Sequence, residues 1–422
     1  MANPGRNPPF VSQRLATSVG QGRRCPTSSH PIACPAQDLA AYPGKYPHWG
    51  ITLAELASQE RAHPVARKRL SKAVPLASRL LPWYADHGRH DLPWRKTQDA
   101  YALYLAEIML QQTRVETVKP YYHRFLARFP HWQSLAGAPL DDVLALWSGL
   151  GYYARARNAK RCAEQILAAH GGHFPADLSA AMDLPGVGRS TAAAVLASAY
   201  GQQQAILDAN ARRVLFRYHG LEGLPRAATN ERRLWQLAEE ETPPNAHEYN
   251  QAIQDLGALL CRSQQPQCGC CPLSDLCRGK DKPLQAGASR QARPQRLAVF
   301  LGLEDEQGRL LLERRPQKGI WGGLWALPWV EVSSLALSME CCDALLAKAA
   351  KEYGVQLQFQ RLSKVYRHVF THFDLQYVIL WAGLRVLALG DAASARLISR
   401  ADSQALGLPS PLRRLLDDGQ RG

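Results

Sequence analysis

The sequence predicts a mostly helical region followed by a separate α+β domain. Residues 278–295 are polar and basic, which is typical of a linker. After this linker, short strand-like runs and turns replace the helical period, so 296–422 is predicted to form the second domain. Before it, within 73–277, apolar residues recur at helical spacing in 100–117, 139–148, 155–169, 190–200 and 249–261.

The predicted second domain opens with an apolar run, 297–303, that is typical of a strand. Asp305-Glu306-Gln307-Gly308 predicts a turn, and 310–312 predicts the returning strand. A helix over 342–353 and strands near 363–369 and 375–382 complete the expected elements.

Composition favours a globular protein that binds a polyanion. The chain has 422 residues, of which 46% are hydrophobic and 21% charged, enough for two or three domains with hydrophobic cores. No apolar run approaches the roughly 18–20 residues that cross a bilayer, so no membrane partner is expected. The net charge of +15 indicates nucleic acid as the partner, with solubility alone as the alternative.

Residues 1–72 form an N-terminal extension that we expect to be disordered. Its first 37 residues contain no Asp or Glu, but they include four arginines and many Ser, Pro and Gly. Such a segment resembles an organellar transit peptide, and a start site assigned too far upstream is the alternative. We expect a cytoplasmic, nucleoid-associated protein if the source is bacterial, and a nuclear or mitochondrial one if it is eukaryotic.

The most specific motif is a compact loop of four cysteines, Cys261-x6-Cys268-x2-Cys271-x5-Cys277. Four thiolates at short spacing can hold a [4Fe–4S] cluster or a zinc ion. Two CxxC pairs separated by a long loop would favour zinc, whereas one compact loop with unequal gaps favours the cluster. The pattern is not a secreted disulfide framework, so it indicates a reducing compartment.

A second motif, residues 184–191, joins two segments of helical pattern through the sequence Leu-Pro-Gly-Val-Gly-Arg-Ser-Thr. Gly186 and Gly188 allow a tight turn and a close approach to another molecule. The backbone N–H groups that begin the next helix can then bind a phosphate. This is the arrangement of a helix–hairpin–helix, which positions DNA without reading its sequence. A plain helix–helix corner is the alternative.

Two carboxylates occupy unusual positions. Glu107 falls on the same helical face as Leu103, Ala106 and Leu110, and a carboxyl group among apolar side chains tends to keep its proton. It would suit a general acid, unless it lies at the edge of the face and reaches solvent. Asp208 fits a helix N-cap, and as a partly buried anion it could also face a developing positive charge.

These features, in this order, resemble the MutY family of adenine glycosylases within the endonuclease III superfamily. The likeness runs from about residue 76 to 277 and resumes more loosely over 296–415. The matching segments also include Leu92-Pro93-Trp94-Arg95, residues 107–113, residues 149–155, Asp208 to Arg213, and Asn250-Gln251-Ala252.

The resemblance implies a six-helix barrel with a helix–hairpin–helix, packed against an iron–sulfur cluster domain, with the active site in the cleft between them. Glu107 matches the acid that protonates the flipped adenine, and Asp208 matches the carboxylate that stabilises the oxocarbenium-like sugar. Ala209 stands where many members have Gly, which leaves Asp208 in place.

Other positions match residues that touch DNA in the family. Arg95 and Gln251 match residues that line the adenine pocket, whereas Gln112 and Tyr152 match residues that wedge into the duplex near the lesion. The remaining expected contacts with DNA in this region are Leu110, Thr113, Gly186, Gly188, Ser190 and Asn210.

Ser190 separates two activities within the superfamily. Endonuclease III relatives have a Lys at this position, and its amine can attack the sugar and form a Schiff base that leads to strand cleavage. A Ser cannot do this. The expected enzyme is therefore monofunctional: it uses water and leaves an abasic site.

The second domain resembles the Nudix-like domain of MutY proteins, which is related to enzymes that hydrolyse 8-oxo-dGTP. A working Nudix helix has several Glu residues that bind Mg²⁺, but residues 347–355 contain only Glu352. Recognition without hydrolysis is therefore expected. The segment Phe370-Thr371-His372 matches the family loop that contacts 8-oxoguanine, and Thr371 keeps the hydroxyl of the Ser that is common there.

The sequence thus predicts a monomeric, monofunctional adenine DNA glycosylase of base excision repair, with a [4Fe–4S] cluster and with A:8-oxoguanine or A:G mispairs as its substrates. An endonuclease III-like glycosylase and AP lyase is disfavoured by Ser190. A non-enzymatic iron–sulfur DNA-binding protein is disfavoured by the presence of both Glu107 and Asp208. A Nudix pyrophosphohydrolase is disfavoured by the missing carboxylates.

Overall fold

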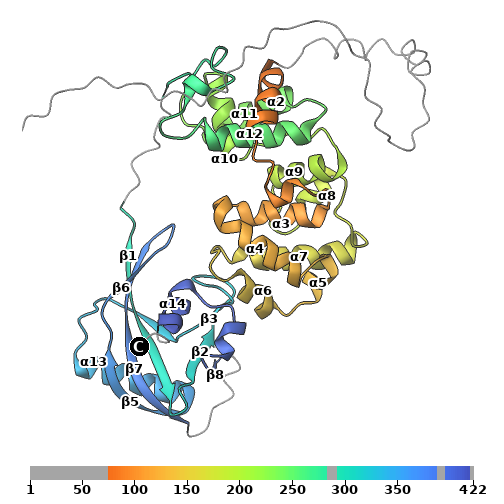
Figure 1. Cartoon of the computed structure of the whole chain (residues 1–422). Helices are drawn as coiled ribbons and strands as arrows, with labels where there is room; N and C mark the ends of the chain where they lie inside the picture. The colour runs from red at the N-terminus through yellow and green to blue at the C-terminus, as the bar shows by residue number, and fades with distance from the viewer. Residues whose placement is uncertain (1–74, 283–291, 387–394, 419–422) are drawn as a thin grey trace, which may run out of the picture. The chain divides into compact units, whose positions relative to one another are not determined.

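A computed structural model describes residues 75–282, 292–386 and 395–418 (Figure 1). The predicted N-terminal extension, 1–72, and half of the predicted linker, 278–295, lie outside these residues. Within the described part of the chain, no helix is both long and apolar enough to span a membrane.

The helical region contains two bundles, each with its own hydrophobic core. The core of the first bundle includes Trp147, Tyr101, Tyr104 and Phe125, all fully buried. This bundle comprises α3 (Ala100–Leu110), α4 (Val115–Arg128), α5 (Trp132–Gly137), α6 (Leu140–Trp147), α7 (Ala154–Ala169), α8 (Leu178–Met182) and α9 (Arg189–Tyr200).

The second bundle joins segments that are far apart in the sequence. Its first helix, α2 (Pro75–His87), packs against α12 (Ala246–Leu259), as Figure 1 shows. Helices α10 (Ala209–Tyr218) and α11 (Ala228–Glu241) and the four-cysteine loop complete it. The chain therefore passes between the bundles twice, from α2 to α3 and from α9 to α10. These crossings carry the short helix η2 (Pro93–Arg95) and Asp208 respectively.

One helix prediction is wrong. The expected helix over 100–117 is broken: α3 ends at Leu110, and α4 begins at Val115. Gln112 between them has a φ of 57°, a left-handed conformation that no α-helix contains. Apolar side chains on both sides of the break enter the same core, so the helical period continues through it. The other four helical segments are confirmed to within a few residues at each end.

Among the residues that the structure describes, the C-terminal domain contains a mixed sheet of eight strands in which β3-β2-β1-β7-β5 are neighbours. The central strands β1 and β7 are parallel, and the other pairs are antiparallel. The strands are β1 (Gln295–Asp305), β2 (Leu310–Arg314), β3 (Trp325–Ala326), β4 (Trp329–Val332), β5 (Val355–Leu362), β6 (Tyr366–Val369), β7 (Asp374–Val386) and β8 (Ala395–Ile398).

Helices cover both faces of this sheet. On one face, α13 (Met339–Tyr353) buries Leu346 and Tyr353 against the strands. On the other face lies α14 (Ser410–Asp418), which follows the short helix η4 (Asp402–Ala405) and buries Leu412. A mostly helical region followed by an α+β domain is thus confirmed, although β3, β4, β5, β8 and α14 were not predicted.

Candidate active site

A cavity of about 1010 Å³ collects residues from both helical bundles. Its walls come from η2, α3, α9, α12 and the segment that leads into α10. Nine of the predicted site residues line it: Arg95, Glu107, Leu110, Gln112, Thr113, Ser190, Asp208, Asn210 and Gln251. The cavity does not include the hairpin glycines, the four cysteines or the 370–372 loop.

Glu107 lies near the end of α3, among buried apolar neighbours that include Leu103. The pKa of Glu107 is raised to about 8, mainly by burial of the carboxyl group and in addition by the negative charge of Asp208. The positive charge of Arg95 acts in the opposite direction. The carboxyl group is therefore mostly protonated at neutral pH, as a general acid requires.

Asp208 is the N-cap of α10, as the sequence predicts. Its Oδ1 accepts a hydrogen bond of 2.8 Å from the backbone N–H of Ala211, which satisfies one of the free donors at the helix start. Burial raises the pKa of Asp208, and its hydrogen bonds and Arg213 oppose this rise. Asp208 thus combines a structural cap with a position on the cavity wall.

Ser190 stabilises the segment that carries Asp208. Its Oγ accepts a hydrogen bond of 3.0 Å from the backbone N–H of Leu207. The side chain of Asn210 is held as well, because its Oδ1 accepts a hydrogen bond of 2.8 Å from Arg213. Arg213 also donates to the carbonyl oxygen of Cys261, at 2.6 Å, which joins this wall of the cavity to the cysteine loop.

Arg95 is held by a buried carboxylate that the sequence analysis missed. Asp255 on α12 is fully buried, and both of its oxygens accept hydrogen bonds from Arg95, at 2.6 and 2.7 Å. Arg89 donates to the same carboxylate through its backbone and its side chain. Burial raises the pKa of Asp255, but the two arginines outweigh it and leave the pKa below its ordinary value.

A chain of hydrogen bonds orients Gln251 on the same helix. Its Oε1 accepts a bond of 2.5 Å from Tyr84, and its Nε2 lies 3.2 Å from Nε2 of His247. Nδ1 of His247 is 2.8 Å from Oγ of Ser198. Burial lowers the pKa of His247, which favours a neutral ring that accepts from the Gln251 amide. The direction of the amide is thus set by its neighbours.

The predicted hairpin before α9 requires glycine at only one of its two positions. Gly186 has a φ of 78°, and a Cβ there would lie 2.9 Å from the side chain of Asn158. Gly188 is the N-cap of α9, with a φ of −94°, and nothing lies within 4 Å of its hypothetical Cβ. Its role is therefore limited to leaving space beside the free N–H groups of α9.

The four cysteines interact with one another. Burial is the main cause that raises the pKa of Cys271 to about 11; the neighbouring Cys261, Cys277 and Cys268 contribute to the rise, and a backbone hydrogen bond from Leu273 opposes it. Arg217 donates a hydrogen bond of 3.3 Å to Sγ of Cys261. In the parts of the chain that the structure describes, no group of three or more His, Cys, Asp or Glu is placed to hold a metal ion.

A further cavity, of about 820 Å³, contains the predicted wedge and lesion residues: Gln112, Tyr152, Phe370, Thr371 and His372. The hydroxyl groups of Tyr152 and Thr371 are 3.2 Å apart. Both side chains are exposed, so they are free to contact another molecule. Gln112 lines this cavity as well as the first one.

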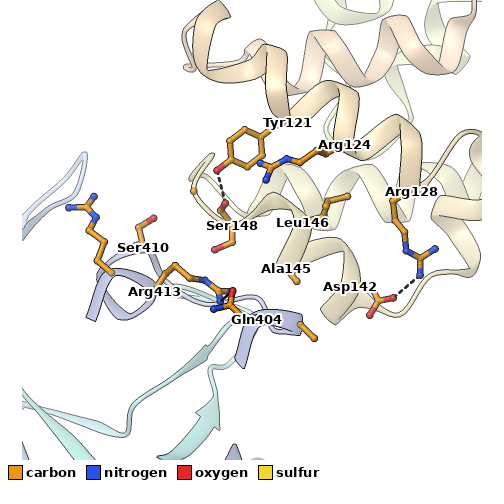
Figure 2. A pocket seen from close by; sticks show the side chains of 13 residues that line it. Tyr121, Arg124, Arg128, Asp142, Ala145, Leu146, Ser148, Gln404, Ser410 and Arg413 are labelled. Carbon is orange, nitrogen blue, oxygen red and sulfur yellow. Dashed lines mark hydrogen bonds and ion pairs between the residues drawn. The ribbon is translucent and has the colours of Figure 1, made fainter. Parts of the chain in front are cut away.

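Figure 2 shows another pocket, whose helical wall contains none of the predicted site residues. In its wall, Tyr121 on α4 donates a hydrogen bond of 2.7 Å to the carbonyl oxygen of Ser148. Ser148 directly precedes the loop that carries Tyr152, so Tyr121 fixes the start of that loop.

Sequence reasoning missed the residues that hold the site together. Asp255 and His247 are each four residues from Gln251 on α12, so helical spacing places all three on one face. This spacing could have drawn attention to His247 and Asp255 from the sequence alone. Their partners Tyr84, Arg89 and Ser198, however, come from other helices or loops. Only the fold brings them into contact.

Both regions of the chain match known protein families. Residues 105–240 match the HhH-GPD superfamily of base excision DNA repair proteins, and residues 298–418 match the NUDIX domain family. An adenine DNA glycosylase of Buchnera aphidicola subsp. Acyrthosiphon pisum (strain APS) is 33% identical, over 80% of this chain and 96% of its own length.

Two further proteins are similar to this chain. The adenine DNA glycosylase of Mus musculus is 32% identical, over 72% of this chain and 69% of its own. A solved structure described as a thermostable thymine-DNA glycosylase is 31% identical with a TM-score of 0.46, covering 52% of this chain and 100% of that one.

Proposed function

Because the chain belongs to the adenine DNA glycosylase family, we propose that its inter-bundle cavity removes adenine from A:8-oxoguanine and A:G mispairs by hydrolysis. The observation that carries this proposal is the pair of carboxyl groups in one cavity, of which Glu107 has a pKa of about 8. An acid for the base and an anion for the sugar are what the reaction requires.

Breaking the bond between base and sugar leaves electron density on the adenine and positive charge on the sugar. Glu107 donates its proton to the adenine, which turns the base into a better leaving group. Asp208 places negative charge beside the sugar, and water completes the hydrolysis. Charge that is already in place before the reaction is usually the largest contribution to catalysis. Glu107 and Asp208 thus act on opposite ends of the same bond.

Arg95 and Gln251 hold the base once it has left the duplex. Extruding an adenine costs a few kcal/mol, roughly, and contacts in the pocket must offset this cost. Arg95 is fixed by Asp255, and Gln251 is fixed by Tyr84 and His247, so neither needs to be ordered when the base enters. A rigid pocket of this kind binds with a smaller entropy cost.

We expect the enzyme to leave abasic sites, with strand breaks on an A:8-oxoguanine duplex appearing mainly after alkali. Ser190→Lys should raise borohydride trapping of a protein–DNA adduct, because it supplies the missing amine. Ser190→Ala is the matched control, since it also removes the hydrogen bond to Leu207 but adds no amine. Efficient trapping by the wild-type protein would contradict the monofunctional mechanism, and absence of adenine release would contradict the proposed function.

Thr371 is the proposed reader of 8-oxoguanine, together with Phe370 and His372. A lost hydrogen bond of this kind is worth on the order of 1 kcal/mol, so Thr371→Val should lower the preference for A:8-oxoguanine over A:G several-fold. Thr371→Ser keeps the hydroxyl and should retain the preference. Single-turnover excision rates on both duplexes measure the effect. An unchanged preference in Thr371→Val would remove Thr371 from this role.

We propose that Cys261, Cys268, Cys271 and Cys277 bind the [4Fe–4S] cluster that the family resemblance implies. Cys261 is one cause of the raised pKa of Cys268, Cys271 and Cys277, so the four sulfurs lie near one another, and an arginine donates to the sulfur of Cys261, as suits a centre bound by thiolates. The cluster would hold the cysteine loop in shape for contacts with phosphate. Elemental analysis should find about four iron atoms per chain, and one zinc atom instead would contradict the assignment.

We further propose that the protein acts as a monomer on double-stranded DNA, in whichever compartment holds the genome. The net charge of +15 supports DNA as the partner.

A further inference from the structure

Two loops next to the active site share an unusual backbone feature. Gln112 has a φ of 57° and Tyr152 a φ of 49°, both left-handed conformations that residues other than glycine rarely adopt. Such conformations persist only where the surrounding structure imposes them. The residues that impose this geometry therefore decide whether Gln112 and Tyr152 are placed to enter the duplex.

One buried guanidinium reaches both loops. Arg155 at the start of α7 is only 8% exposed. At the first loop, its Nη1 donates hydrogen bonds to the carbonyl oxygens of Ile108 (2.8 Å), Met109 (2.7 Å) and Gln111 (2.7 Å). Its Nη2 donates to Oγ1 of Thr113, at 3.0 Å. Arg155 thus holds the residues on both sides of Gln112.

The same guanidinium holds the second loop. Nη2 of Arg155 donates to the carbonyl oxygens of Leu150 (3.3 Å) and Gly151 (3.1 Å), which precede Tyr152. Its Cζ lies 5.5 Å from the centre of the Tyr152 ring, within the range of a cation–π contact. Tyr121 fixes the start of this loop through Ser148 (Figure 2), and a Cβ at Gly149 would collide with the Tyr121 hydroxyl.

The charge of Arg155 is stabilised by dipoles, since the hydrogen bonds described above are accepted by carbonyl and hydroxyl oxygens. Ile108 and Met109 belong to the last turn of α3, where carbonyl oxygens lack partners within the helix and a cation is favoured. The same contacts fix the end of the helix that carries Glu107. A planar group with several donors suits this site better than an ammonium ion does.

We infer that Arg155 is a positioning residue that couples the two DNA-probing loops, so that Gln112 and Tyr152 enter the duplex together. Arg155 itself is buried, so we assign it a role in holding the two loops and not in the reaction. The inference rests on the proposed function, because it takes Gln112 and Tyr152 as the residues that probe DNA.

The test separates base extrusion from bond cleavage. Extrusion is followed by the fluorescence of 2-aminopurine placed beside the target adenine in an A:8-oxoguanine duplex. Excision is measured on that duplex, and on one in which the adenine faces an abasic site and is already unpaired. Arg155→Met and Arg155→Lys are compared with Arg161→Met, which removes an exposed charge from the same helix. Thermal melting and iron content verify that each variant is folded.

We expect Arg155→Met to extrude the base about tenfold more slowly or worse, since several hydrogen bonds to a charged group are lost. Excision of the unpaired adenine should fall much less. Arg155→Lys keeps the buried charge but has only three donors, so it should show an intermediate loss of extrusion rate. If Arg155→Met does not fold, the extrusion rate of Arg155→Lys tests the inference instead. Arg161→Met should behave as wild type.

Equal losses on both duplexes in a folded Arg155 variant would overturn the inference, because a purely structural role would affect both. Wild-type extrusion in Arg155→Lys and Arg155→Met would overturn it as well. The double variant Gln112→Ala/Tyr152→Ala tests separately whether Gln112 and Tyr152 probe DNA at all. If it extrudes the base normally, these two residues do not probe DNA, and that part of the proposed function is wrong instead.

Discussion

Glu107→Gln is expected to abolish adenine release while DNA binding stays close to that of the wild type. The variant keeps the size and much of the hydrogen bonding of the side chain, but it has no acidic proton to donate. General acid catalysis contributes roughly 10²–10⁴-fold, so single-turnover excision should fall by at least that factor. Binding depends mainly on the basic surface, which this change leaves intact.

The pH dependence of the wild type follows from the same carboxyl group. Because burial raises the pKa of Glu107 to about 8, excision should decline as the pH rises through about 8. Glu222→Gln, which changes an exposed loop residue, should show the wild-type rate and pH profile. A Glu107→Gln variant that is folded and still excises adenine at the wild-type rate would contradict the assigned acid.

Stability should change with pH in a matching way. A carboxyl group whose pKa in the folded protein lies above its ordinary value of 4.5 favours folding when it is protonated. Its contribution is complete below pH 4.5 and is lost as the pH rises through about 8. Glu107→Gln cannot ionise, so denaturant unfolding should show less loss of stability at high pH than in the wild type. This measurement tests the pKa independently of catalysis.

Sequence patterns reveal a functional residue when its unusual position depends only on the residues next to it in the chain. Helical spacing places Glu107 on an apolar face, and the position before a helix marks Asp208 as a cap, whereas their proposed catalytic roles come from the family resemblance. Both properties need only the neighbouring residues. Asp255, His247 and Arg155 were missed because their roles arise from contacts with distant segments, and a buried charged residue looks like an exposed one in the sequence.

The missed elements of the fold have similar physical reasons. The break after Leu110 was invisible because α3 and α4 bury apolar residues in the same core. Strand β5 alternates between buried or half-buried and exposed positions, but it carries polar residues such as Gln356 and Gln358 that weaken the pattern. The run 297–303 was clear because β1 lies in the middle of the sheet, next to a parallel strand and between two helical layers.

Asp208→Asn should remove the charge beside the sugar while keeping the helix cap. Asn is as good an N-cap as Asp, and its side-chain oxygen can still accept from the N–H of Ala211. The unfolding free energy should therefore change little. Excision should fall by roughly 10²–10³-fold, the cost of removing one preorganised electrostatic group from an active site. Asp177→Asn is the matched control, because Asp177 caps α8 through a bond of 2.9 Å to Ala180 but is exposed.

Asp208→Asn should also alter the behaviour of Glu107. The negative charge of Asp208 is one cause of the raised pKa of Glu107, so its removal should lower that pKa. The residual activity of Asp208→Asn should consequently decline at a lower pH than that of the wild type, whereas the Asp177→Asn profile should not move. A loss of rate with an unshifted profile would mean that the two carboxyl groups are not coupled across the cavity. A stable Asp208→Asn variant with the full wild-type rate would exclude Asp208 from charge stabilisation and leave it only the role of a cap.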